Sequence, residues 1–187
     1  MTELLSTEAT YLDHLMIIKK EFMNPLHSAA KQRPRPLVRM EDVEVIFAFI
    51  PQLIILSTAL FCRLHDTIHY ATEHSGQGIG RVFCDLEDQF AVYIFYAVNF
   101  SKLQKCLAKT ADNIVYRQLV QNSLRKKETN RMGLSDYMIA PIQRITRYCL
   151  LLKDLKKRTS PSHLDYPYLD RALKSLSALA WAMNDIQ

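Results

Sequence analysis

The amino-acid sequence predicts an all-α protein. It has 187 residues but only four glycines, about 2% of the chain, where soluble proteins average about 7%. β-Sandwiches and doubly wound α/β folds need many tight turns, for which glycine is a favoured residue, so neither class fits. Apolar residues make up 49% of the chain, enough for the core of one domain of this size. We therefore expect a single, mostly helical domain spanning residues 1–187.

The first two predicted helices follow from apolar residues spaced three and four apart, the spacing of one helix face. The first helix begins near Leu4, and Pro25 together with the Arg-Pro-Arg-Pro stretch at 33–36 ends it. Its apolar face consists of Leu4, Tyr11, Leu15, Ile18 and Phe22. A second helix is expected from about Asp42 to Tyr70, because the apolar segment there is too long for a strand.

The second predicted helix contains an uncharged run that raises the question of a membrane span. Residues 45–62 form 18 positions without a charge, which is the lower length limit for a spanning helix. Pro51 and several polar residues interrupt the run, and no basic or aromatic belt frames it. We therefore expect a core helix of a soluble protein.

Four further helices complete the pattern. A third carries apolar residues over 83–103, and a fourth covers about 112–127. The fifth begins near Ser135, a good N-cap residue, and Pro141 inside it predicts a kink or a displaced helix start. The last helix has its apolar face over 169–183. Its pattern is still running when the sequence stops, so we expect a domain excised from a longer protein.

Two local motifs resemble ligand sites but have simpler explanations. His65 and His69 lie one helical turn apart, as in zinc proteases, but Asp66 replaces the usual glutamate and only His74 or a distant carboxylate could be a third ligand. The glycine-rich segment 76–80 follows a helix and lacks a Gly-Lys-Ser/Thr sequence, so a linker is favoured over a nucleotide loop. We expect no metal and no cofactor.

The cysteines and the charges limit the cellular setting and the partners. None of the four cysteines forms a Cys-x-x-Cys pair, which favours buried free thiols in a reducing, cytoplasmic compartment. Residues 121–158 contain ten basic and three acidic residues, a net +7, so the rest of the chain carries −2 of the total +5. This segment is either a solvated helix face or a surface for an acidic partner. Without a zinc finger or an RNP motif, nucleic acid is not favoured.

Glu8 is the most informative single residue in the first predicted helix. It interrupts the apolar face between Leu4 and Tyr11. A carboxylate at a core position loses hydration energy unless it is paired or reaches a surface. An internal salt bridge and an acceptor for a partner protein both explain it, and the residues alone leave the two alternatives open.

Three segments resemble the conserved regions of the Dbl-homology domain of Rho-family guanine nucleotide exchange factors. The sequence Glu-Leu-Leu-Ser-Thr-Glu-Ala-Thr-Tyr at 3–11 is similar to the first region, and 83–99 is loosely similar to the second. Residues 134–152 are similar to the third, including a Pro-x-Gln-Arg-Ile-x-Arg-Tyr core at 141–148 that is highly specific. The resemblance spans the chain from Leu4 to Asp185.

The resemblance implies an elongated bundle of about six main helices whose first, fifth and last helices bind a Rho-family GTPase. Its activity would be acceleration of GDP release by stabilising the nucleotide-free GTPase, without covalent chemistry, cofactor or nucleic acid. Other regions of the full-length protein, usually a pleckstrin-homology domain among them, would recruit this cytoplasmic domain to membrane or cytoskeleton. The alternative is an exchange-inactive helical adaptor that binds a GTPase or another acidic partner.

The resemblance also implies roles for individual residues. Glu8 would contact switch I, which favours the partner explanation for this carboxylate. The residues expected at switch II are Arg147 and Asn184, and the further GTPase-binding residues are Gln143, Arg144, Arg131 and Met132. The last two would determine GTPase identity, and Arg131 slightly favours Rho over Rac.

Two positions depart from the family pattern. Ala140 stands where a lysine usually precedes the proline, which removes a cation from this face or its rim. Cys149 replaces the usual proline after Arg-Tyr, which should leave the helix straighter.

Overall fold

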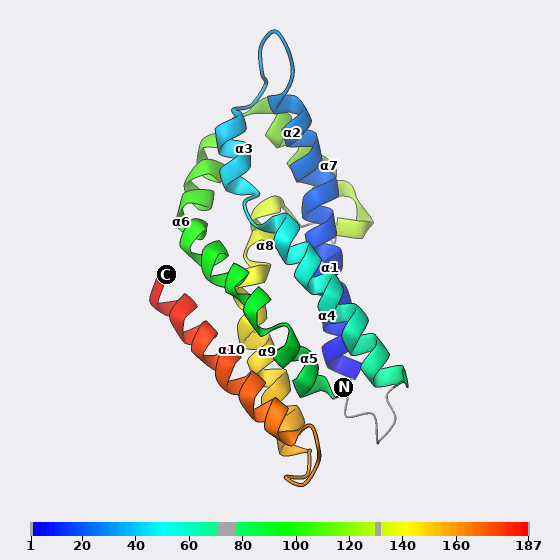
Figure 1. The fold of residues 1–187 in the computed structure, drawn as a ribbon. Coiled ribbons are helices and arrows are strands. Elements are labelled where there is room, and N and C mark those ends of the chain that lie inside the picture. The colour runs from blue at the N-terminus through cyan, green and yellow to red at the C-terminus, as the bar shows by residue number, and fades with distance from the viewer. Residues whose placement is uncertain (1, 71–77, 130–131, 187) are drawn as a thin grey trace.

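A computed structural model describes residues 2–70, 78–129 and 132–186, and every regular element within them is helical. The elements form a long bundle, with the loop that joins α2 to α3 at one end and the loop that joins α9 to α10 at the other (Figure 1). The elements are α1 (Thr2–Ile17), a π-helical segment (Ile18–Met23), α2 (Asn24–Ala30), α3 (Met40–Ile46), α4 (Ile50–Tyr70), α5 (Ile79–Asp85), a 3-10 turn (Glu87–Ala91), α6 (Val92–Thr110), α7 (Ile114–Arg125), a second 3-10 turn (Lys127–Thr129), α8 (Leu134–Met138), α9 (Ala140–Lys157) and α10 (Tyr166–Ile186). The predicted all-α class is confirmed.

The N-terminal helical segment is longer than the sequence predicts. Pro25 was expected to end it, but helical structure continues from Thr2 to Ala30. Pro25 lies in the first turn of α2, directly after the π-helical segment Ile18–Met23. A proline nitrogen cannot donate to the preceding turn, and the wider π geometry there accommodates a residue without that hydrogen bond.

The second predicted helix is divided into two. The chain turns at Phe49, whose φ of 70° lies in the left-handed region that non-glycine residues rarely adopt. After this turn α4 packs its buried residues, among them Leu53, Leu60 and Leu64, into the common core. The stretch Met40–Tyr70 contains an 18-residue window with a mean hydropathy of 2.3, and by length and composition it could cross a membrane. A buried core helix passes the same test, and α1 covers one side of α4.

The third predicted helix is also divided, because α5 and α6 are separated by a 3-10 turn. The short helix α5 is anchored by Asp165, whose carboxylate accepts the backbone N–H groups of Gly80 at 2.8 Å and Arg81 at 3.0 Å. Gly80 lies against the backbone of Leu169 in α10, where a Cβ would clash. Close packing of α5 on α10 therefore explains Gly80 without a nucleotide, while His74 and Gly76 lie outside the described residues.

The fifth predicted helix starts later than Ser135, as Pro141 suggested. A short α8 ends at Met138, and α9 begins at Ala140 with Pro141 in its first turn. The residue before α8 is Gly133, whose N–H donates to the Asp136 carboxylate at 2.8 Å. This break directs α9 along α10, its main packing partner.

The cysteines are free thiols in the structure, but their predicted burial holds only in part. Cys62 is exposed, and the other three are half-buried.

Gly80→Ala should lower the free energy of unfolding by about 1–3 kcal/mol, because its methyl group must push α5 away from α10. Denaturant unfolding followed by circular dichroism measures this loss. Gly133→Ala is the control, since its Cβ would meet only side-chain atoms at 3.7 Å or beyond, and it should cost less than about 1 kcal/mol. Equal losses for both variants would contradict the packing argument.

Candidate functional site

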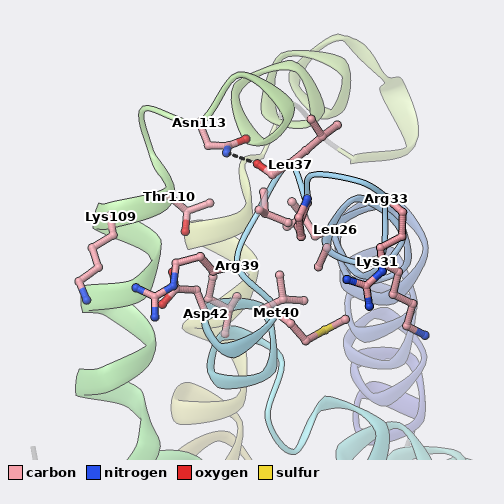
Figure 2. Close-up of a pocket in the computed structure, with 15 residues that line it drawn as sticks. Leu26, Lys31, Arg33, Leu37, Arg39, Met40, Asp42, Lys109, Thr110 and Asn113 are labelled. Carbon is pink, nitrogen blue, oxygen red and sulfur yellow. Dashed lines mark hydrogen bonds and ion pairs between the residues drawn. The ribbon is translucent and has the colours of Figure 1, made fainter.

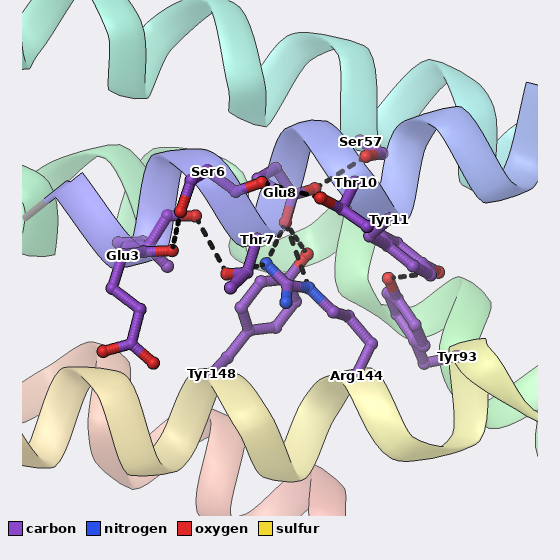
Figure 3. Close-up of polar contacts among 11 residues, drawn as sticks. Glu3, Ser6, Thr7, Glu8, Thr10, Tyr11, Ser57, Tyr93, Arg144 and Tyr148 are labelled. Carbon is purple, nitrogen blue, oxygen red and sulfur yellow. Dashed lines mark hydrogen bonds and ion pairs between the residues drawn. The ribbon is translucent and has the colours of Figure 1, made fainter. Parts of the chain in front are cut away.

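The centre of the molecule holds one fully buried carboxylate, that of Glu8 on α1. One of its oxygens accepts a hydrogen bond from the Ser57 hydroxyl of α4 at 2.6 Å. The other accepts from Nε and Nη2 of Arg144 at 3.1 and 2.6 Å and from the Tyr148 hydroxyl at 2.7 Å. Figure 3 shows Arg144 and Tyr148 reaching from α9 to this carboxylate. Four hydrogen bonds therefore compensate the lost hydration of Glu8.

Arg144 is the cation of this buried pair and is itself only 6% exposed. Its guanidinium carbon lies 4.4 Å from the Tyr148 ring centre and 5.4 Å from that of Tyr11, within cation–π distance of both. Burial alone would lower the pKa of Arg144, but Tyr148 and Glu8 outweigh it and raise that pKa. The guanidinium is therefore held charged between two rings and a carboxylate.

The tyrosines around the pair join it to the rest of the core. The Tyr11 and Tyr93 hydroxyls lie 2.9 Å apart, which links α1 to α6. Tyr148 meets the Phe83 ring edge-on, with centroids 5.4 Å apart. Burial, followed by the negative charge of Glu8, raises the pKa of Tyr148 well above its ordinary value. The Tyr148 hydroxyl therefore remains a donor at neutral pH.

These contacts bear directly on the two explanations for Glu8. In the free domain its carboxylate forms the internal salt bridge, and neither oxygen reaches the surface. Arg144, which was expected to contact a GTPase, is buried and forms the ion pair with Glu8. A contact between Glu8 and switch I stays a prediction, and it requires the carboxylate to exchange some of its internal partners for external ones.

A groove of about 360 Å³ lies directly above this network, between α1 and α9. Tyr11 and Arg144 line it from inside, while Gln143 and Arg147 are exposed. Arg147 pairs with Glu3 at 2.5 Å, and both side chains are about half exposed. Ala140, the departure from the family pattern, also lines the groove, so a short side chain stands where a lysine would extend.

The remaining predicted site residues are spread over other elements. Asn184 is exposed in the last turn of α10, and no hydrogen bond or ion pair among the described residues joins it to Glu8, Arg144 or Arg147. Met132 is half-buried, with its carbonyl accepting the Ser123 hydroxyl at 3.0 Å. Arg131 lies outside the described residues.

The antiparallel register of α9 and α10 shows how Asn184 relates to the groove. Cys149 lies opposite Ser177, and Lys156 pairs with Asp170 at 2.5 Å. Extending this register by two helical turns puts Asn184 level with the start of α9, where the groove lies.

The basic segment 121–158 is largely compensated within the molecule. Among the described residues, five of its ten cations form ion pairs with acidic side chains, and four of those acids lie on other parts of the chain. These pairs are Lys126–Glu21, Arg144–Glu8, Arg147–Glu3, Lys156–Asp170 and Arg158–Asp154. The net charge of the segment therefore overstates the charge that this surface offers to a partner.

Two residues that complete the network, Ser57 and Tyr148, were not predicted from the sequence. Ser57 was seen only as an interruption of an apolar run, although a buried hydroxyl there needs a hydrogen-bond partner. Tyr148 was seen as part of a motif without a role. The sequence feature that could have indicated both residues is a polar side-chain atom at a position of the helix that faces the core.

Comparison with known proteins gives this fold a family. The model of the RhoGEF domain matches residues 1–184. The chain belongs to the RhoGEF domain family.

The relatives of this RhoGEF domain are much longer proteins. It is 30% identical over 186 residues to "Protein vav" of Drosophila melanogaster, covering 99% of this chain and 22% of that protein. It is 27% identical over 187 residues to the human phosphatidylinositol 3,4,5-trisphosphate-dependent Rac exchanger 2 protein, covering 99% of this chain and 12% of that protein.

Solved structures agree with this assignment. A structure of the Vav1 exchange factor matches 98% of this chain and 47% of its own, with a TM-score of 0.80 and 29% identity. A p115-RhoGEF structure, at 20% identity, shares the fold with a TM-score of 0.83 over 99% of this chain and 54% of its own.

Glu8→Gln should lower the free energy of unfolding by about 3 kcal/mol or more, because it leaves the buried Arg144 guanidinium without an anion. Chemical denaturation of both proteins at neutral pH measures the difference. Glu3→Gln is the matched control, since it breaks an exposed pair with Arg147 and should cost less than about 1 kcal/mol. A loss no larger for Glu8→Gln than for Glu3→Gln would show that the buried pair contributes little.

Proposed function

We propose that this RhoGEF domain accelerates GDP release from a Rho-family small GTPase. The observation that carries the proposal is the groove between α1 and α9, which lies over a rigid, fully hydrogen-bonded base and is bordered by exposed polar residues. Membership of the family and similarity to proteins named as Rac exchange factors support the same activity.

The mechanism would be differential binding. A catalyst of nucleotide release binds the nucleotide-free GTPase, and the path to it, more tightly than the loaded form. Such a surface works best when it is preorganised, because little binding energy is then lost in ordering it. The network beneath the groove supplies this rigidity, since Glu8 ties α1 to both α4 and α9.

The proposed roles of the site residues follow from their exposure. Arg147 would exchange its solvent-exposed pair with Glu3 for an acidic group of switch II, at small cost. Asn184 and Gln143, both exposed, would donate or accept hydrogen bonds at the same partner. Glu8 would contribute mainly by holding Arg144 and the groove in place, and would meet switch I only after releasing part of its network.

Two observations bear on the choice of GTPase, and they point to different members of the Rho family. The sequence analysis slightly favoured Rho through Arg131, whereas relatives at 26–30% identity are named for Rac, including two from Dictyostelium discoideum. Met132 is flexible and unbranched, and it could accept different partner residues. We therefore place Rac first among the substrates to be tested.

One observation favours the second candidate, an exchange-inactive adaptor. All four hydrogen bonds to Glu8 are formed within the chain, so the carboxylate expected to act on switch I is already satisfied. A domain that binds a partner through its exposed residues alone would need Glu8 only for folding.

Release of a fluorescent GDP analogue from a panel of Rho-family GTPases that includes Rac and Rho tests the two candidates. We expect the wild-type domain to accelerate release from one of them, and Asn184→Ala and Arg147→Ala each to reduce the accelerated rate about 10-fold to 100-fold. This range corresponds to losing a hydrogen bond that involves a charged group. Both side chains are exposed, so neither substitution should affect folding.

Lys153→Ala is the matched control, because Lys153 is an exposed cation of the same helix, more than one turn beyond Arg147. It should leave the rate within about twofold of wild type. Acceleration that survives both Asn184→Ala and Arg147→Ala would contradict the assigned roles. Absence of acceleration on every GTPase, together with measurable binding, would favour the adaptor.

A further inference from the structure

A large cavity lies at the end of the bundle that carries the loop between α2 and α3. It encloses about 790 Å³ between this loop, residues 31–39, and the facing parts of α3 and α6. Figure 2 shows Arg39 and Lys109 on one side of it and Lys31 and Arg33 on the other. Four cations and a single acidic residue, Asp42, therefore line one cavity.

The interior of the cavity is apolar, in contrast to its rim. Leu26, Val43 and Ile46 are buried side chains of the core that form its floor, and Met40 is half-buried beside them. A cavity with an apolar floor and a cationic rim fits a ligand that carries negative charge on one part and hydrocarbon on another.

The cations at the rim of the cavity differ in whether acidic side chains of the same chain pair with them. Arg39 pairs with Glu41 at 2.5 Å and approaches Asp42 at 4.0 Å. Within the described residues, Lys31, Arg33 and Lys109 form no ion pair. These three charges are therefore available to a ligand at low cost.

The loop that forms one wall is held in place at Leu37. The Leu37 N–H donates to the Ala29 carbonyl at 3.1 Å, and its own carbonyl accepts the Asn113 side-chain amide at 2.7 Å. Asn113 is itself fixed, because its side-chain oxygen caps α7 through the Val115 N–H at 2.9 Å. The Leu37 side chain is nevertheless 47% exposed, between the basic residues Arg35 and Arg39.

The positive charge continues beyond the cavity along α6. Lys102, Lys105 and Lys109 are exposed and spaced three and four apart, which places them on one face of the helix. Cations spread over the cavity rim and along α6 are suited to many headgroups at once, whereas a single acidic peptide would occupy only the cavity.

We propose that this end of the domain binds the surface of an anionic phospholipid membrane, with phosphate-bearing headgroups at Lys31 and Arg33 on one side of the cavity and at Lys109 on the other, and with the Leu37 side chain in the interface. The site lies at an end of the bundle and uses no residue of the α1–α9 groove, so binding of lipid and of GTPase would be independent (Figure 1). The proposal does not depend on exchange activity.

Cosedimentation with vesicles tests the proposal directly. The wild-type domain should bind vesicles of phosphatidylcholine with phosphatidylserine, and more tightly those that also contain phosphatidylinositol bisphosphate, but not phosphatidylcholine alone. Each cation near such a surface contributes roughly a fivefold factor, so Arg33→Ala with Lys109→Ala should weaken binding about 25-fold. Raising the salt concentration should weaken binding of the wild type.

The control variant is Lys153→Ala with Lys157→Ala, which has the same net charge but lies near the opposite end of the bundle (Figure 1). It should bind vesicles as the wild type does, and circular dichroism should show both double variants folded. Equal weakening in both double variants, or no binding to any anionic vesicle, would overturn the proposal.

The Leu37→Ser variant distinguishes binding to a membrane from binding to a soluble anion. It should weaken vesicle binding but leave calorimetric binding of inositol hexakisphosphate unchanged, because only the membrane offers hydrocarbon to this side chain. Vesicle binding unaffected by Leu37→Ser would show that the cavity binds a phosphate group without the interface. Binding of polyglutamate but not of vesicles would point instead to an acidic protein. Either result would overturn the membrane proposal.

Discussion

The buried ion pair between Glu8 and Arg144 is the interaction on which the arrangement of this domain depends. It joins positions 136 residues apart and draws α1, α4 and α9 to one carboxylate. An ion pair in a core is stabilising only when its remaining hydrogen-bonding capacity is used. Here Ser57 and Tyr148 use it, and the tyrosine hydroxyl contact between α1 and α6 extends the same network.

This network explains how a site without catalytic groups could act on a partner. An exchange factor gains its effect from binding one state of the GTPase better than another, so a surface that deforms would bind both states alike. The groove rests on buried, mutually constrained side chains, while Gln143 and Arg147 at its border remain free to change partners. A rigid base beneath the groove and exchangeable contacts at its border are the combination that differential binding needs.

The sequence predicted the helical class and the approximate position of every main helix, because apolar spacing reports directly on the buried face. It missed the break at Phe49, whose left-handed backbone has no glycine to mark it. It also missed the continuation past Pro25, where a π-helical segment accommodates the proline. Glu8 was recognised as anomalous, but its partners Ser57 and Arg144 are 49 and 136 residues away, and no local pattern encodes such a contact.

The distribution of charge shows most clearly what the tertiary structure adds to the information in the sequence. Counting along the chain places the positive surface in residues 121–158, yet among the described residues four of those ten cations pair with acids that folding brings from other parts of the chain. A fifth pairs with an acid one turn away on the same helix. Residues 31–39 and Lys109 at the end of α6 are less conspicuous in sequence, because at least 70 positions separate them along the chain (109 minus 39). An unpaired cation attracts an anion far more than a paired one does, since its field is not already cancelled. The cavity at the end of the bundle is such a place, because folding gathers cations there from separate segments and, within the described residues, three of them have no paired acid.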